Sequence, residues 1–276
     1  MPLPDPHALL KEAEKNQQRV EEIREDYTYT LHETDVEIDG KGKIKQKSEN
    51  AYEVFRAHGQ PIRKQILKNG RPLSQSEAKK EQERVEQAIR RAEKRKKEEQ
   101  ERKAKRERER ARRQQHSDEG EDDGDDDVGI GDFLRISQLT NPRRERFRGQ
   151  EVVVFEFEPR LGHKPRNRIE SLVQRLTGSI WVDPNAKEVV RLEARLVDSF
   201  KIGGGLVASL GRGSALIFEQ EMVHNEVWLP SYGEVDVTAR VLLFGGLRTH
   251  RISRFSNYKK FNVESSQEIQ SPAPPE

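Results

Sequence analysis

The sequence predicts an α+β fold that is mainly antiparallel β, with one curved sheet covered by a few helices and interrupted by a long charged helical insertion. Three observations predict it. Apolar and polar residues alternate at period two over much of the chain, short turn signals separate the alternating segments, and residues 74–127 have the composition of neither a strand nor a core. The links between alternating segments are too short for parallel crossovers, so neighbouring strands are expected to be antiparallel.

The composition divides the chain into two unlike parts. Charged residues make up 36% of the 276 residues, whereas about a quarter is typical of soluble domains. Residues 74–127 alone hold 17 basic and 18 acidic residues, and the other 222 residues are about 29% charged. That remainder is large enough for one large domain or two small ones. The net charge of +2 excludes a uniformly basic nucleic-acid binder.

Several classes of chemistry lack the residues that they need. Without cysteine there is no disulfide, no thiolate nucleophile and no Cys-ligated metal. The seven histidines are scattered without an HExxH pattern, and no G-x-S-x-G sequence surrounds a serine. No apolar run approaches the roughly 20 residues that span a bilayer. We therefore expect no catalytic residues, no cofactor, no metal and no transmembrane segment.

The N-terminal part, residues 1–73, is predicted to be a helix followed by strands. Asp5 is a plausible N-cap for a helix over residues 5–25, in which apolar residues recur at helical spacing: Leu9, Leu10, Ala13, Val20 and Ile23. The period then changes to two from Tyr27. Further strands are expected over 43–57 and 62–68, with turn signals at 39–42 and 69–70.

The insertion begins with a capping box, Ser74 and Glu77, and predicts a helix that continues to about Gln114. Its short apolar stripe is formed by Val85, Ala88, Ile89 and Ala92. Residues 74–114 carry a net charge of +7, and the eight acids of residues 117–127 predict a disordered acidic linker of charge −8. Because the two charges can cancel and the helix has no aromatic residue for base stacking, a self-compensating insertion is favoured over contact with RNA. A protein partner for helix 74–114 remains an alternative.

The C-terminal part, residues 128–264, predicts most of the strands. A short helix is expected around Phe133, Ile136 and Leu139, another over 169–176, and strands over 151–158, 178–183, 188–200, 214–223, 226–230, 233–244, 248–255 and 260–263. Alternation places four residues on one face: Val190, Leu192, Ala194 and Leu196. The glycine-rich residues 203–214 lack the lysine and the following helix of a phosphate loop, so they predict a flexible hairpin connection, or alternatively an uncharged flap over an apolar cavity. Residues 265–276 are expected to be a disordered tail.

Short motifs in this part resemble a known family. Gly178-Ser179-Ile180-Trp181-Val182-Asp183-Pro184 is followed by Val189-Val190-Arg191-Leu192, and Val227-Trp228-Leu229-Pro230 and Asn257-Tyr258-Lys259-Lys260-Phe261 occur further on. With one helix ahead of a Tyr-rich strand, these segments resemble the periplasmic lipoprotein carrier superfamily of LolA, LolB and the sheet domain of RseB. The resemblance covers about 220 residues and leaves out the charged insertion.

The resemblance implies a half-barrel whose apolar concave face shelters an acyl chain of a lipid or lipoprotein, without catalysis, in the periplasm of the bacterial cell envelope. On that reading the candidate cavity-lining residues are Phe155, Phe157, Leu192, Leu216, Phe218 and Met222, with Trp228 at the rim. The start, Met1-Pro2-Leu3-Pro4-Asp5, lacks the basic and apolar regions of a secretory leader. The cytosol therefore stays open as an alternative compartment. A structural or interaction protein that uses helix 74–114 is the alternative function.

Overall fold

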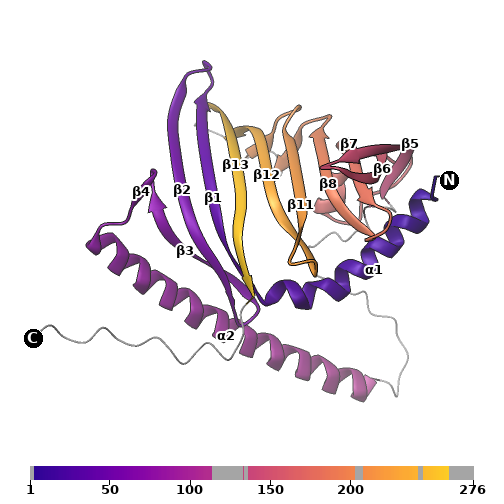
Figure 1. Ribbon diagram of the computed structural model, residues 1–276. Helices are drawn as coiled ribbons and strands as arrows, with labels where there is room; N and C mark the ends of the chain where they lie inside the picture. The colour runs from indigo at the N-terminus through magenta and orange to yellow at the C-terminus, as the bar shows by residue number, and fades with distance from the viewer. Residues whose placement is uncertain (1–2, 114–132, 134–135, 203–207, 242–244, 261–276) are drawn as a thin grey trace, which may run out of the picture.

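A computed structural model describes residues 3–113, 133, 136–202, 208–241 and 245–260, and shows one antiparallel sheet of 13 strands with three helices. The predicted fold class is confirmed (Figure 1). The helices are α1 (Pro6–Glu25), α2 (Gln75–Arg113) and α4 (Arg168–Val173). The strands are β1 (Tyr27–Asp39), β2 (Ile44–Ala57), β3 (Gln60–Lys68), β4 (Arg71–Pro72), β5 (Ser137–Phe147), β6 (Gln150–Pro159), β7 (Leu176–Asp183), β8 (Glu188–Leu196), β9 (Phe200–Ile202), β10 (Ala208–Leu210), β11 (Ala215–Val223), β12 (Val227–Val241) and β13 (Gly245–Lys260).

Some expectations fall outside the described residues. These are the acidic linker 117–127, the glycines Gly203 to Gly205, the end of the last predicted strand at 261–263 and the tail 265–276. The expected flap is described only at its borders, where β9 and β10 pair with each other and β10 also pairs with β12.

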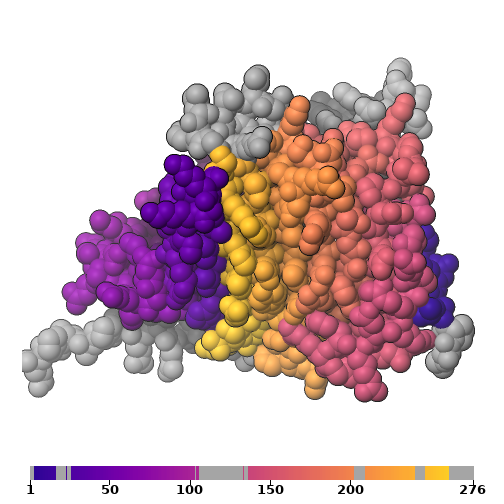
Figure 2. All heavy atoms as spheres, turned by 90° about the horizontal axis from the view of Figure 1, so that it is seen from above, coloured from indigo at the N-terminus to yellow at the C-terminus, as the bar shows by residue number. Residues whose placement is uncertain are grey.

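The order of strands in the sheet joins the two ends of the chain. It runs β4-β3-β2-β1-β13-β12-β11-β8-β7-β6-β5, so the last strand lies between the first strand and β12. β1 and β13 pair over nearly their whole length, from Tyr27 opposite Lys260 to Asp39 opposite Leu247. Figure 2 shows this arrangement as the yellow C-terminal strand beside the indigo N-terminal strands. The parts before and after the insertion therefore form one continuous sheet.

This order makes α2 a connection between opposite edges of the sheet. β4 and β5 are the two ends of the strand order, and neighbouring strands lie about 4.8 Å apart, so ten spacings along the curved sheet amount to roughly 48 Å. A helix of 39 residues is about 58 Å long at 1.5 Å per residue. Figure 1 shows α2 extending below the strands from the β4 side toward α1. The length of the insertion thus matches the path that the chain has to cover.

α1 packs its apolar residues against one face of the sheet, which we call the helix face. Leu9 and Leu10 are buried against residues of β6 and β7: Val153, Phe155, Ile180 and Val182. Near the C-terminal end of α1, Ile23 packs against Tyr27 and the ends of β11 and β12. Asp5 caps the helix, since its Oδ1 accepts the backbone N–H groups of His7 at 2.7 Å and Ala8 at 3.1 Å.

The first half of α2 protects the edge of the sheet at β3. Glu81 Oε1 accepts the backbone N–H of Gln65 at 2.6 Å, and Arg84 donates to the carbonyl oxygen of Arg63. The two α2 side chains also bond each other, with Arg84 Nε 2.7 Å from Glu81 Oε2. Backbone groups on an unpaired edge strand invite pairing with another chain, and here side chains of the same chain occupy them. The predicted apolar stripe lies on this side of α2, with Val85 and Ala92 buried.

Two predicted breaks between strands are β-bulges instead, and a third bulge lies in β5, where no strand was predicted. The expected gap at residues 231–232 is one extra residue, Ser231, within the continuous strand β12. Asn257 has a φ of 54° inside β13 and provides the extra residue opposite β1, so the strands predicted over 248–255 and 260–263 are one strand. Asn141, with a φ of 49°, lies at a register shift in β5. Turn-forming residues were read as strand ends because bulges use the same residue types.

The short helix expected around Phe133, Ile136 and Leu139 is partly wrong. Phe133 and Ile136 have helical backbone, but Leu139 lies in β5 and pairs with Phe157. The sequence analysis missed this strand, because the charged run Arg143 to Arg146 lacks the apolar alternation of a half-buried strand. The predicted helix over 169–176 ends at Val173, and Leu176 begins β7.

Gly178 explains part of the motif that carries the family resemblance. A Cβ on this residue would lie 1.8 Å from the carbonyl oxygen of Glu193 on β8, so β7 and β8 can approach this closely only at glycine.

Replacing Glu81 by alanine should loosen the β3 edge. The variant leaves the Gln65 N–H without its acceptor, which should lower the free energy of unfolding by about 1–2 kcal/mol. It should also speed hydrogen exchange at the Gln65 amide. The Arg84 bond and the Gln65 N–H lower the pKa of Glu81, against the effect of burial. The wild-type contribution is therefore present at neutral pH and lost as the pH falls below the usual Glu range. Glu83→Ala, at an exposed position of the same helix, is the control, and unchanged exchange at Gln65 would contradict edge protection.

Candidate functional site

A cavity of about 480 Å³ lies on the helix face of the sheet. It is bounded by β-strands from both parts of the chain and by Phe133 and Val173. Most of its lining is apolar or aromatic: Tyr27, Tyr29, Val54, Phe55, Pro61, Phe133, Phe157, Val173, Leu176, Ile180, Val189, Leu192, Ala194, Leu216, Phe218, Leu229, Pro230 and Tyr258. Its volume falls in the range of about 300–1,000 Å³ that is usual for small-molecule sites.

Aromatic rings from β1 and β13 form one wall. Tyr258 lies between Tyr27, at 6.3 Å between ring centroids, and Tyr29, at 5.3 Å. On the far side of the cavity Phe133 meets Phe157 edge to face at 4.9 Å. Offset and edge-to-face contacts of this kind hold rings in fixed orientations. The walls are therefore apolar surfaces of defined shape.

Two tyrosine hydroxyl groups of this wall, those of Tyr27 and Tyr258, are bonded to protein. The Tyr27 hydroxyl donates to Glu226 Oε2 at 3.0 Å and lies 3.3 Å from His224 Nδ1, while Lys260 holds the other oxygen of Glu226 at 2.6 Å. The Tyr258 hydroxyl donates to the carbonyl oxygen of Pro230. Burial, and then the bond to Glu226, raise the pKa of Tyr27 to about 12. The Tyr27 phenol therefore stays protonated at neutral pH and acts as a packing group.

Only three other polar side chains line the cavity among the described residues. Glu188 is buried and its Oε1 accepts from Asn16 Nδ2 at 3.0 Å, and Gln220 Nε2 donates to the carbonyl oxygen of Val189 at 2.6 Å. Arg56 is exposed at the end of β2, where it donates to the carbonyl oxygen of Gly59 at 3.0 Å. The interior is thus mainly apolar, its two buried polar side chains are bonded to protein, and Arg56 places a positive charge at the rim.

The structure brings four of the seven predicted lining residues together. Phe157, Leu192, Leu216 and Phe218 line the cavity. Phe155 lies instead in the closed core under α1. Trp228 packs with Val152, Val154 and Val190, and Met222 is its cross-strand partner and is 39% exposed. Neither Met222 nor Trp228 lines the cavity.

Val190 also departs from the predicted face. The pairing of β7 with β8 passes from Trp181 opposite Arg191 to Val182 opposite Val189, so Val190 is the extra residue of a bulge. Val189 and Leu192 face the cavity, whereas Val190 packs with Trp228. A bulge shifts the alternation of side chains between faces, and strict alternation could not anticipate it.

The sequence analysis missed the lining residues from β1, β2 and β13, foremost Tyr27, Tyr29, Val54, Phe55 and Tyr258. The period-two pattern showed that Tyr27 and Tyr29 share a face. It did not show that β1 lies beside β13, because that pairing joins segments more than 200 residues apart.

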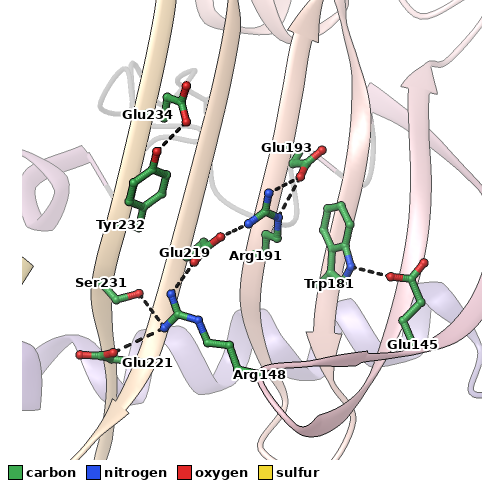
Figure 3. Close-up of polar contacts among 10 residues, drawn as sticks. All are labelled: Glu145, Arg148, Trp181, Arg191, Glu193, Glu219, Glu221, Ser231, Tyr232 and Glu234. Atoms are coloured by element: carbon green, nitrogen blue, oxygen red, sulfur yellow. Dashed lines mark hydrogen bonds and ion pairs between the residues drawn. The ribbon is translucent and has the colours of Figure 1, made fainter. Parts of the chain in front are cut away.

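The opposite face of the sheet, which we call the polar face, carries a network of ion pairs (Figure 3). Arg191 of β8 pairs with Glu219 and Glu193, and Arg148, at the β5–β6 turn, reaches Glu219 at 2.5 Å. Arg148 also approaches Ser231 at 3.3 Å and Glu221 at 3.5 Å. The network therefore ties the β5–β6 hairpin to β8, β11 and β12.

Aromatic rings enclose the central guanidinium of this network. The Arg191 guanidinium carbon lies 5.5 Å from the Trp181 ring centroid and 5.8 Å from that of Phe147. The Trp181 indole N–H donates to Glu145 at 3.1 Å. Cation–π contacts and ion pairs act together here, so the network stabilises the packing of these strands.

The described ranges contain no candidate metal site and no candidate membrane-spanning helix. No group of three or more His, Asp or Glu side chains there is arranged to hold a metal ion. In the same residues no helix is long and apolar enough to cross a membrane.

Comparison with known proteins gives distant structural likenesses. No family model and no curated protein matches the sequence. Among solved structures the chain is similar to a DUF1329 family protein from Desulfovibrio piger, with 12% identity over 96% of this chain and 100% of that chain and a TM-score of 0.31. It is also similar to MucB in its complex with MucA(peri), with 9% identity over 94% of this chain and 100% of that chain and a TM-score of 0.24. At these TM-scores the likenesses assign no function to this chain.

Among the tyrosines whose pKa is raised by burial, Tyr27 should ionise at the highest pH. Its folded-state pKa of about 12 lies above the ordinary value of 10, so protonated Tyr27 contributes stability below pH 10 that is lost as the pH rises toward 12. Ultraviolet titration should show one ionisation near pH 12 that is missing in Tyr27→Phe and retained in Tyr232→Phe. If all phenols of the folded protein ionise together near pH 10, the buried arrangement of Tyr27 is wrong.

Removing Arg191 should weaken the fold through Glu219, whose side chain is only 10% exposed. Arg191→Leu leaves this carboxylate with Arg148 alone and should lower the free energy of unfolding by about 2 kcal/mol. Arg195→Leu, at an exposed position of the same strand, should cost much less. Chemical denaturation of the two variants measures the difference. Equal losses of unfolding free energy would show that the network stabilises the fold no more than an exposed arginine does.

Proposed function

We propose that the cavity binds a single apolar chain, such as an acyl chain of a lipid or lipoprotein, and that the protein acts by reversible binding without catalysis. The observation that carries the proposal is the cavity itself. It is open on the helix face and mainly apolar inside, and the polar groups of Tyr27, Glu188, Gln220 and Arg56 are already bonded to protein. A polar ligand would find few partners there.

The energetics suit a reversible carrier or sensor. Each methylene moved from water into the cavity contributes about 0.8 kcal/mol, and the loss of freedom on binding offsets several of these contributions. A partly buried chain would therefore bind usefully and still be released. The shape of the aromatic wall supports an extended chain lying along Tyr258, Leu192 and Phe218, which all face the same space.

We assign this activity to the bacterial cell envelope, with the periplasm as the compartment that the sequence resemblance implies. Acyl chains there have to cross an aqueous space between lipid surfaces, and a protein that shelters one chain meets that need. Native mass spectrometry of the protein purified without detergent tests the proposal directly. Bound lipid of stoichiometric amount supports it, and the absence of bound lipid together with no uptake of an added fatty acid would contradict it.

The strand β11 offers a matched pair of positions for a sharper test. Leu216 lines the cavity and is 38% exposed, whereas Met222 on the same strand is 39% exposed and lies outside it. Leu216→Glu removes apolar contact and places a charge at the cavity wall, so it should weaken binding of a fluorescent fatty acid at least tenfold. Met222→Glu should change the affinity less than twofold. Equal effects of the two substitutions, measured by fluorescence titration, would place binding elsewhere.

A further inference from the structure

The charge of α2 is distributed unevenly along the helix. Residues 75–93 contain five basic and five acidic residues, and residues 94–113 contain twelve basic and five acidic residues. The first segment is therefore neutral and the second, which we call the overhang, carries +7. The whole chain carries +2, so everything outside the overhang has a net charge of −5. A solvated connecting helix does not require this asymmetry, since mixed charges of both signs suffice for solubility.

The change in charge coincides with the end of contact between α2 and the sheet. In the neutral segment Glu77 bonds Lys68, Glu81 bonds the β3 backbone, and Val85 and Ala92 are buried. From Lys94 to Arg102 every side chain is exposed. Figure 1 shows the helix continuing past the lower ends of β2 and β3. Among the α2 side chains that the structure describes, those that pack on or bond the sheet belong to the neutral segment.

The overhang begins beside the mouth of the cavity. The exposed lining residues Arg56 and Pro61 flank the β2–β3 turn, which contains His58. Helix α2 packs against both β2 and β3, and Figure 1 shows it passing the lower ends of these strands, where the turn lies. Arg56 adds a positive charge of its own at the mouth. The cationic helix and the opening of an apolar cavity therefore share one end of the molecule.

We infer that residues 94–113 bind an anionic lipid bilayer and hold the mouth of the cavity against it. The inference goes beyond the proposed binding of an acyl chain and names the surface from which that chain comes. A bilayer containing anionic lipids attracts Lys and Arg side chains, each with roughly a fivefold gain in affinity. The overhang has no apolar face, so the attachment is electrostatic and reversible.

Nucleic acid fits the same charge less well. Helix α2 contains no aromatic residue for base stacking, and a nucleic-acid surface gives no reason for the overhang to begin at the mouth of an apolar cavity.

Vesicle sedimentation with the full chain tests the inference. The protein should sediment with phosphatidylcholine vesicles that contain phosphatidylglycerol, should not sediment with pure phosphatidylcholine, and should be released by high salt, because surface charges are screened within a Debye length. Replacing Arg95, Lys96, Arg102 and Lys105 by glutamine should weaken the binding at least tenfold. The matched control replaces Lys79, Lys80, Arg90 and Arg91, four basic residues of the neutral segment, and should stay within twofold of wild type.

Three outcomes would overturn the inference: no sedimentation with anionic vesicles at low salt, equal weakening by the two variants, or retention of single-stranded RNA by the overhang without binding to vesicles. Binding of a fluorescent fatty acid in detergent-free solution separates this inference from the proposed function. Both variants should keep that binding. A wild-type protein that binds the fatty acid but does not bind anionic vesicles would contradict only the binding of the overhang to a bilayer. A protein that does not bind the fatty acid would contradict the proposed binding of an acyl chain in the cavity. Circular dichroism confirms that both variants keep their helix.

Discussion

The pairing of β1 with β13 is the interaction on which the rest of the structure depends. It joins residues near both ends of the chain into adjacent strands, and it makes a single sheet from two meanders. Once these strands are neighbours, β4 and β5 become the two edges, and the chain between them has to pass from one edge to the other. A long helix is an economical connection because it satisfies its own backbone hydrogen bonds over the whole distance. The insertion therefore follows from the topology.

The same pairing creates the candidate site. Tyr27 and Tyr29 come from β1, Tyr258 comes from β13, and together they form the aromatic wall that faces Leu192 and Phe218. Neither meander alone would enclose this space. Ligand binding and stability are thus linked, since a chain held in the cavity would contact both sides of the β1–β13 seam and favour the closed sheet over any state in which the seam opens.

Local patterns predicted the elements and the apolar identity of the helix face, but not how the elements combine. Alternation in β8 placed Leu192 on the apolar face, and Leu216 and Phe218, which were named from the family resemblance, also line the cavity. Alternation failed at Val190, where a bulge shifts it, and Trp228, which the resemblance placed at the rim, packs on the other face. The contributions of Tyr27 and Tyr258 depended on a pairing between distant segments, and no single-sequence pattern encodes such a pairing.

The two faces of the sheet differ in whether they have to be covered from water, and the cavity results from this difference. On the polar face, ion pairs and stacked rings around Arg191 are compatible with water, so that face needs no helix. On the helix face, the apolar side chains need cover. Of the helices that the structure describes, α2 lies along the β3 edge, α4 has six residues, and α1 packs over β6 and β7 and the ends of β11 and β12. The described helices leave part of that face uncovered between them, and an apolar surface left in this way is stabilised by an apolar ligand.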